Sequence, residues 1–295
     1  MAVTRPTADL TIARHLRLGP IKRADRDVGH NGRVRKLVIG VAATLTVLIV
    51  AAVGVDFGAA IYAEYRLARS LRTANQLNWD PTAAILGFPF LTQAARHHYD
   101  EIELRAYGVE HPVVGKVSLE ATLHDIDPLD GSWLIGPDAT LRVGMVESRI
   151  LIDSTHVGRH LGITDLLVEA PEPESEDDTT ESGISVPHGV VFTGTPRQVG
   201  LSERVSISVD LSLTGPDRST LVITATHVLT GPGTADTEVP EDKLAAVLAA
   251  FSGTIPDQRL PFAPAPTAYG ARGSDLVIEG IAAEQTLPLS GFRRI

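Results

Sequence analysis

An uncharged apolar run from 37 to 55 constrains this chain more than any other feature of its sequence. As a helix rising about 1.5 Å per residue, its nineteen residues reach roughly 28 Å, which matches the hydrocarbon core of a bilayer. Arg33, Arg35 and Lys36 precede the run, and Asp56 follows it. Because basic flanks stay on the cytoplasmic side, the sequence predicts a single-pass transmembrane helix with a cytoplasmic N-terminus.

Two other interpretations of the run are weaker. A cleaved signal peptide has a shorter leading region than the 36 residues found here, although the small residues 58–60 keep cleavage open. A buried core helix usually shows a polar stripe, which this run lacks. An uncleaved anchor at 37–55 is therefore the prediction, with the main domain at 56–295 outside the cell membrane.

Charge separates the two sides of the run. Residues 1–36 carry nine basic and three acidic side chains, and their proline and glycine content is typical of a disordered arm. The arm either attracts anionic inner-leaflet lipid or acts only as a topology signal. Because the whole chain carries −10 and the arm carries +6, the other 259 residues carry −16. A domain with this negative charge repels the phosphate backbone of nucleic acids, so no nucleic acid is expected as a partner.

The region after residue 80 alternates apolar and polar residues with period two, which predicts strands with one buried face. Each run is short and several are separated by Gly-Pro or Asp-Pro turns, which favours an antiparallel meander. The clearest apolar positions are Ile102, Leu104, Ala106; Val117, Leu119, Ala121, Leu123; Leu141, Val143, Met145; Val205, Ile207, Val209, Leu211, Leu213; Leu221, Ile223, Ala225; and Leu276, Ile278.

Helices are predicted at three further places. Residues 59–75 form one that places Ile61, Tyr65 and Ala68 on one side and a row of arginines at three-residue spacing on another. Residues 241–251 carry an apolar stripe behind Pro240, and 154–161 are a weaker candidate. The segment 169–182 holds seven acids and two prolines, which predicts a disordered loop, since calcium binding would need EF-hand spacing.

Motifs for metal or covalent chemistry are sparse. His156 and His160 stand at i, i+4, but Val157 occupies the place of the general base of a zinc protease, and no third ligand is evident. The chain has no cysteine, which rules out disulfides and thiolate metal sites. No catalytic residue, metal site or cofactor is predicted.

The most distinctive segment is Gly87-Phe88-Pro89-Phe90-Leu91-Thr92-Gln93, followed by Tyr99-Asp100-Glu101-Ile102. Two of only seven phenylalanines flank a proline here. Rigid aromatic rings at a bend suit contact with an acyl chain or the mouth of an apolar cavity. The alternative is that they fill the core of the sheet.

These two motifs, with the basic arm and the single span before them, resemble the LmeA-like phospholipid-binding proteins of actinobacterial cell envelopes. Leu260-Pro261-Phe262 and Leu276-Val277-Ile278-Glu279-Gly280 are similar to that family's closing strands. The resemblance covers roughly residues 58–290. It implies an α+β fold similar to the tubular lipid-binding proteins, with a curved antiparallel sheet wrapped on a long helix around an apolar tunnel.

The resemblance also implies the function. It implies phospholipid as ligand, the membrane as partner, and a supporting role in envelope lipid or lipoglycan maturation, with protein partners left open. The residues expected to contact lipid are Ile85, Phe88, Phe90, Leu91, Ile102 and Leu104. One-faced strands need apolar cover, which a bound lipid can supply. Two alternatives stay open: a non-catalytic scaffold of the envelope, and an envelope enzyme acting on lipid or glycan.

Overall fold

The computed structural model describes residues 28–170, 189–215 and 217–293, without the side chains of 28–34. The predicted acidic loop at 169–182 lies, from 171 onward, outside the described residues, as does the arm as far as residue 27. The first helix, α1, runs from Val28 to Asn75. The chain divides within it into two units, residues 1–53 and 54–295, and each is described by itself.

The part of α1 in the first unit contains the predicted apolar run except for its last two residues. Its large side chains, including Leu37, Leu45 and Val50, are exposed along its length. Among the described residues, α1 is the one helix that is long and apolar enough to cross a membrane. The chain thus has a candidate single-pass anchor.

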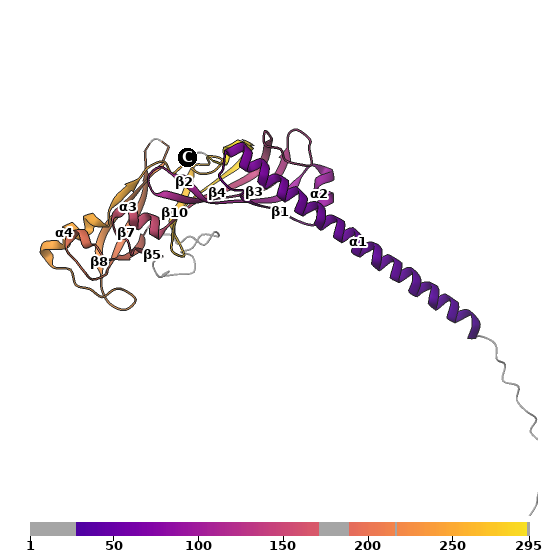
Figure 1. The fold of residues 1–295 in the computed structure, drawn as a ribbon, viewed down its shortest axis with the longest axis horizontal. Helices are drawn as coiled ribbons and strands as arrows, with labels where there is room; N and C mark the ends of the chain where they lie inside the picture. Colours follow the sequence, from indigo (N-terminus) through magenta and orange to yellow (C-terminus); the bar gives the residue numbers. More distant parts are fainter. Residues whose placement is uncertain (1–27, 171–188, 216, 294–295) are drawn as a thin grey trace, which may run out of the picture. The chain divides into compact units, whose positions relative to one another are not determined.

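The second unit contains two antiparallel sheets, neither closed into a barrel (Figure 1). Sheet A has the order β1-β2-β3-β4-β11-β10, with β1 (Thr82–Leu86), β2 (Tyr99–His111), β3 (Gly115–Pro128), β4 (Thr140–Asp153), β11 (Asp275–Pro288) and β10 (Pro266–Arg272). Sheet B has the order β5-β6-β7-β8-β9, with β5 (Leu167–Glu169), β6 (Gly189–Gly194), β7 (Val205–Thr214), β8 (Thr220–Leu229) and β9 (Gly253–Ile255). The α+β class with antiparallel sheets after a long apolar helix is confirmed.

Short helices complete the unit. They are α2 (Phe90–Arg96), α3 (Ser154–Leu161), α4 (Glu241–Ala250) and the 3₁₀ turns η2 (Arg197–Val199) and η3 (Leu289–Gly291). The predictions for α3 and α4 are confirmed, and Pro240 occupies the N-cap position of α4 without a side-chain hydrogen bond. Helix α3 begins where the Asp153 carboxylate accepts a hydrogen bond from the Thr155 N–H at 2.7 Å. Helix α2 was not predicted.

The alternating pattern sets the register of sheet A. Ile102 lies opposite Leu123 and Leu104 opposite Ala121, so apolar side chains of β2 and β3 share one face. The register shifts between Ala106 and Val109, where Gly108 adopts a φ of +64°. This bulge moves the buried set of β2 from even to odd positions, so that Val109 stays in the core.

The second-unit part of α1 lies along sheet A (Figure 1). The side that packs is formed by Ala63, Leu67 and Leu71, which are buried in one continuous cluster with side chains of both sheets. Ile61 and Tyr65, which the sequence placed on an apolar side, are exposed instead. Both sides of this helical segment carry apolar residues, so periodicity alone did not identify the packed one.

A side chain of α1 also forms a hydrogen bond with an edge strand of sheet A. The Glu64 carboxylate of α1 accepts a hydrogen bond at 2.9 Å from the N–H of Ile85, on the edge strand β1. The opposite edge strand, β10, begins at Pro266, which has no N–H to donate.

Candidate functional site

The Gly87–Gln93 motif forms a turn between β1 and α2 that is fixed from inside by one glutamine. Gln93 Nε2 donates to the carbonyl of Leu86 at 3.2 Å, and its Oε1 accepts from the N–H of Asp100 at 2.9 Å. Gly87 has a φ of +99°, and a Cβ there would lie 2.6 Å from Gln93 Nε2. The glycine and the glutamine of the motif are therefore matched to each other.

A buried carboxylate holds the same turn from α1. Asp56 Oδ2 accepts from the N–H of Phe90 at 2.9 Å, and Oδ1 accepts from the N–H of Leu91 at 2.8 Å. The Asp56 residue is only 5% exposed. The sequence identified Asp56 as the polar residue that ends the apolar run, and the structure adds that it binds the start of α2.

Phe90 points inward into an aromatic cluster. Its ring stacks on Tyr99 with centroids 6.2 Å apart and meets Trp133 edge-on at 6.5 Å. The Tyr99 hydroxyl donates to the carbonyl of Trp133. Burial raises the pKa of Tyr99 to about 12, so the phenol keeps this donor at alkaline pH where an exposed tyrosine would ionise.

Phe88 points outward and meets a ring from α1. Its side chain is 63% exposed and stacks on Phe57 with centroids 6.0 Å apart and an interplanar angle of 28°. Leu91 is exposed as well, and its N–H donates to Asp56, the residue before Phe57. We call Phe57, Phe88 and Leu91 the aromatic patch. Exposed apolar side chains grouped in this way are typical of a contact surface for lipid or protein.

The structure therefore divides the six residues expected to contact lipid. Phe88 and Leu91 are exposed in the aromatic patch, whereas Ile85, Phe90, Ile102 and Leu104 are buried in the core. Phe57 was not expected, because it stands 31 positions before Phe88 and two residues after the apolar run. Its only signal in the sequence is that an apolar ring follows directly on a residue expected to mark the end of the span.

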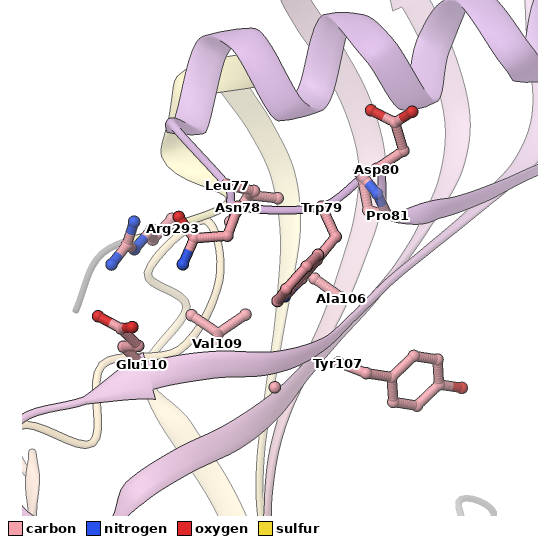
Figure 2. Close-up of a pocket in the computed structure, with 11 residues that line it drawn as sticks. Leu77, Asn78, Trp79, Asp80, Pro81, Ala106, Tyr107, Val109, Glu110 and Arg293 are labelled. Carbon is pink, nitrogen blue, oxygen red and sulfur yellow. The ribbon is translucent and has the colours of Figure 1, made fainter.

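Several hollows lie at the surface of the second unit. A hollow of about 30 Å³ lies under the loop that follows α1, and Figure 2 shows Trp79 projecting from this loop toward Ala106 and Val109 of β2. It has room for about two water molecules and none for an acyl chain. An open groove of about 610 Å³ is lined largely by polar residues, including Lys116, and another of about 490 Å³ has a mixed lining that includes Arg259 and Leu260. Between α1 and sheet A, side chains such as Leu67 and Leu104 fill the interior.

Candidate metal ligands remain apart in the described residues, where no group of three or more His, Asp or Glu side chains is placed to hold an ion. The ring of His160 binds the carbonyl of Thr254 through Nε2 at 3.0 Å. His156 contacts Arg159 at 3.4 Å. These contacts fit two surface histidines.

The second unit is thus of the class of α+β domains in which open antiparallel sheets pack on a helix, and it carries a pair of stacked aromatic rings on its surface. The family described as LmeA-like phospholipid-binding matches residues 54–281, and the chain belongs to this family. The resemblance found in the sequence is thus confirmed. Comparison with curated proteins and with solved structures finds no match.

Proposed function

We propose that this protein is a membrane-anchored phospholipid-binding protein that supports the maturation of envelope lipids or lipoglycans without catalysing a reaction itself. Its family membership supports phospholipid as the ligand. The observation that carries the proposed site is the exposed stack of Phe57 on Phe88 beside Leu91. In the described part of the chain, Phe57 and Phe88 are each more than half exposed, so each has surface free for an acyl chain.

The aromatic patch is the first contact in this proposal, and an apolar tunnel opens behind it. The acyl chain passes between α1 and sheet A when α2 moves aside, and Ile85, Phe90, Ile102 and Leu104 form the wall that it meets. Each buried CH₂ contributes about 0.8 kcal/mol, which offsets the loss of contacts among the parted side chains. Helix α2 is only seven residues long, so its displacement breaks few contacts, chiefly the hydrogen bonds of Asp56 and Gln93.

Phe88→Asp tests the site. In full-length protein purified in dodecyl maltoside, we expect about tenfold less co-purified phospholipid than in the wild type, because a charge replaces a ring that contributes roughly 1.5–3 kcal/mol on burial. Phosphate analysis of the extracted lipid measures the amount. Phe90→Asp is not a usable variant, since Phe90 is 2% exposed and its loss would disturb the core.

Tyr107→Asp is the matched control for Phe88→Asp. Tyr107 is an aromatic residue of β2 that is 59% exposed and lies outside the patch. It should retain the wild-type lipid content, and both variants should keep the wild-type thermal unfolding midpoint. An unchanged lipid content in Phe88→Asp would show that the aromatic patch does not bind lipid. Wild-type protein that purifies without phospholipid would contradict the proposed function.

The proposed topology places the arm, residues 1–36, in the cytoplasm, the span at 37–55, and the lipid-binding domain, residues 56–295, outside. The basic residues before the span and the acidic body after it support this orientation. Protease added to intact spheroplasts is expected to digest the domain and to leave an N-terminal tag intact. Digestion of the tag with protection of the domain would reverse the orientation.

A further inference from the structure

A groove of about 330 Å³ runs along the exposed side of α1 in the second unit. Its lining comes from Tyr62, Tyr65, Arg66, Arg69, Ser70 and Thr73, with Pro137 from the connection between β3 and β4. The lining thus holds two aromatic rings, two basic side chains and two hydroxyl groups, and none of the lining residues is acidic. In a body that carries a net charge of −16, this is a local reversal of sign.

Arg66, Arg69 and Arg72 follow each other along α1 at three-residue spacing, and they differ in what they bind. Arg72 forms an ion pair with Asp80 at 3.2 Å, so an acid of the protein already neutralises it. In the described part of the chain, neither Arg66 nor Arg69 forms an ion pair with an acidic side chain. Their charges are therefore available to an anion from outside.

Arg69 is also held in place for such a ligand. Its Nη1 donates to the hydroxyl of Tyr65 at 2.7 Å, and its guanidinium carbon lies 5.6 Å from the centre of the Tyr65 ring. One guanidinium N–H is used in this way, and the planar group keeps further donors for two oxygens of one phosphate. A fixed guanidinium loses less conformational entropy on binding than a free one.

An exposed apolar stripe leads from the aromatic patch to the groove. Phe57, Ile61 and Tyr65 follow each other at i, i+4, and all three are exposed. From Phe57 to Arg66 the helix rises about 14 Å, a distance that separates the polar head of a lipid from the middle of its tails. Arginine side chains on a helix lean toward its N-terminus, which brings the Arg66 guanidinium closer to the stripe.

We propose that Arg66 and Arg69 bind the phosphate of a lipid headgroup, while the acyl chains of that lipid run along the stripe formed by Phe57, Ile61 and Tyr65 to the aromatic patch, where the proposed tunnel opens. This site rests on the proposed function and makes it specific, because it selects lipids that carry an accessible anionic phosphate. The groove receives the head, and the stripe leads the tails to the patch.

Soluble short-chain ligands test the site in the full-length protein in dodecyl maltoside, a detergent without phosphate. Isothermal titration compares dihexanoyl phosphatidic acid with dihexanoylglycerol, which has the same tails and no phosphate. The wild type should bind the phosphatidic acid at least about tenfold more tightly, since charge-assisted hydrogen bonds are lost with the phosphate. Arg66→Gln/Arg69→Gln should bind the two ligands with equal affinity.

Arg197→Gln/Arg218→Gln is the control with the same change of charge. Both of these arginines are exposed and lie outside the groove, so the control should keep the wild-type preference. A preference for phosphatidic acid that survives in Arg66→Gln/Arg69→Gln would overturn the site. So would an equal loss of preference in the control, because the effect would then come from net charge alone.

Titration with inorganic phosphate distinguishes a lipid headgroup from free phosphate as the ligand of the two arginines. It should bind the wild type at least about tenfold more weakly than the phosphatidic acid, because it has no tails for the stripe. Equal binding of both would overturn the assignment to a lipid. If the wild type binds dihexanoylglycerol as tightly as the phosphatidic acid, the headgroup site is overturned and the proposed function stands. If the wild type binds neither lipid, both are overturned.

Discussion

Arg149→Leu is expected to lower the free energy of unfolding by about 3–5 kcal/mol. Arg149 lies on β4 directly opposite Glu279 of β11, and its Nε donates to the Glu279 carboxylate. Its Nη2 also donates to Glu147 at 2.7 Å. Glu279 is 2% exposed, so the variant removes a positive charge that binds a buried carboxylate. Urea unfolding of the detergent-solubilised protein, followed by tryptophan fluorescence, measures the loss.

Two further variants distinguish the energetic cost of an unpaired buried charge from the cost of losing an arginine side chain. Arg149→Leu/Glu279→Leu should recover most of the stability, because an apolar pair in place of a buried ion pair is often neutral. Arg105→Leu removes the partner of the more exposed Glu103 and should cost less than about 1 kcal/mol. Equal losses in Arg149→Leu and Arg105→Leu would show that the burial of Glu279 is energetically unimportant.

Asp56→Ala is expected to lower the free energy of unfolding by about 3 kcal/mol. The Asp56 carboxylate is the acceptor for the N–H groups of Phe90 and Leu91, and a buried donor left without an acceptor costs about 1–3 kcal/mol. The variant should also release α2 from α1 and separate the ring of Phe88 from Phe57. Urea unfolding gives the energy, and Trp133, which packs on Phe90, reports on the release.

Asp80→Ala is the control for this effect. Asp80 pairs with Arg72 near the surface, with close to half of each side chain exposed, so its removal should cost less than about 1 kcal/mol. A loss in Asp56→Ala no greater than that in Asp80→Ala would mean that solvent replaces the carboxylate at the start of α2. The patch would then depend on the packing of Phe90 alone.

Local patterns predicted much of the fold. The strands with long alternation, β2, β3, β7 and β8, were found because each keeps one face against the core over ten or more residues. Strands β5 and β9 have three residues each, which is too short for a period to show. The division of the strands between two sheets depends on pairings such as β4 with β11, which join residues far apart in the chain.

The candidate site was predicted only in outline. The motif from Gly87 to Gln93 was identified, but alternation does not tell which of Phe88 and Phe90 faces outward. That choice follows from the hydrogen bonds of Asp56 and Gln93, and the first of these spans 34 residues. Contacts of this kind leave no periodic signal, so Phe57 and Asp56 became part of the site only in three dimensions.

The two edge strands of sheet A bear on the membrane anchoring proposed above. Molecules anchored in this way would meet each other at high local density, where an open strand edge lets neighbouring copies pair, β-strand to β-strand, into fibres. The bond from Ile85 to Glu64 occupies an N–H on one margin, and Pro266 removes one on the other. These two features oppose strand pairing between neighbouring copies at the margins of the sheet.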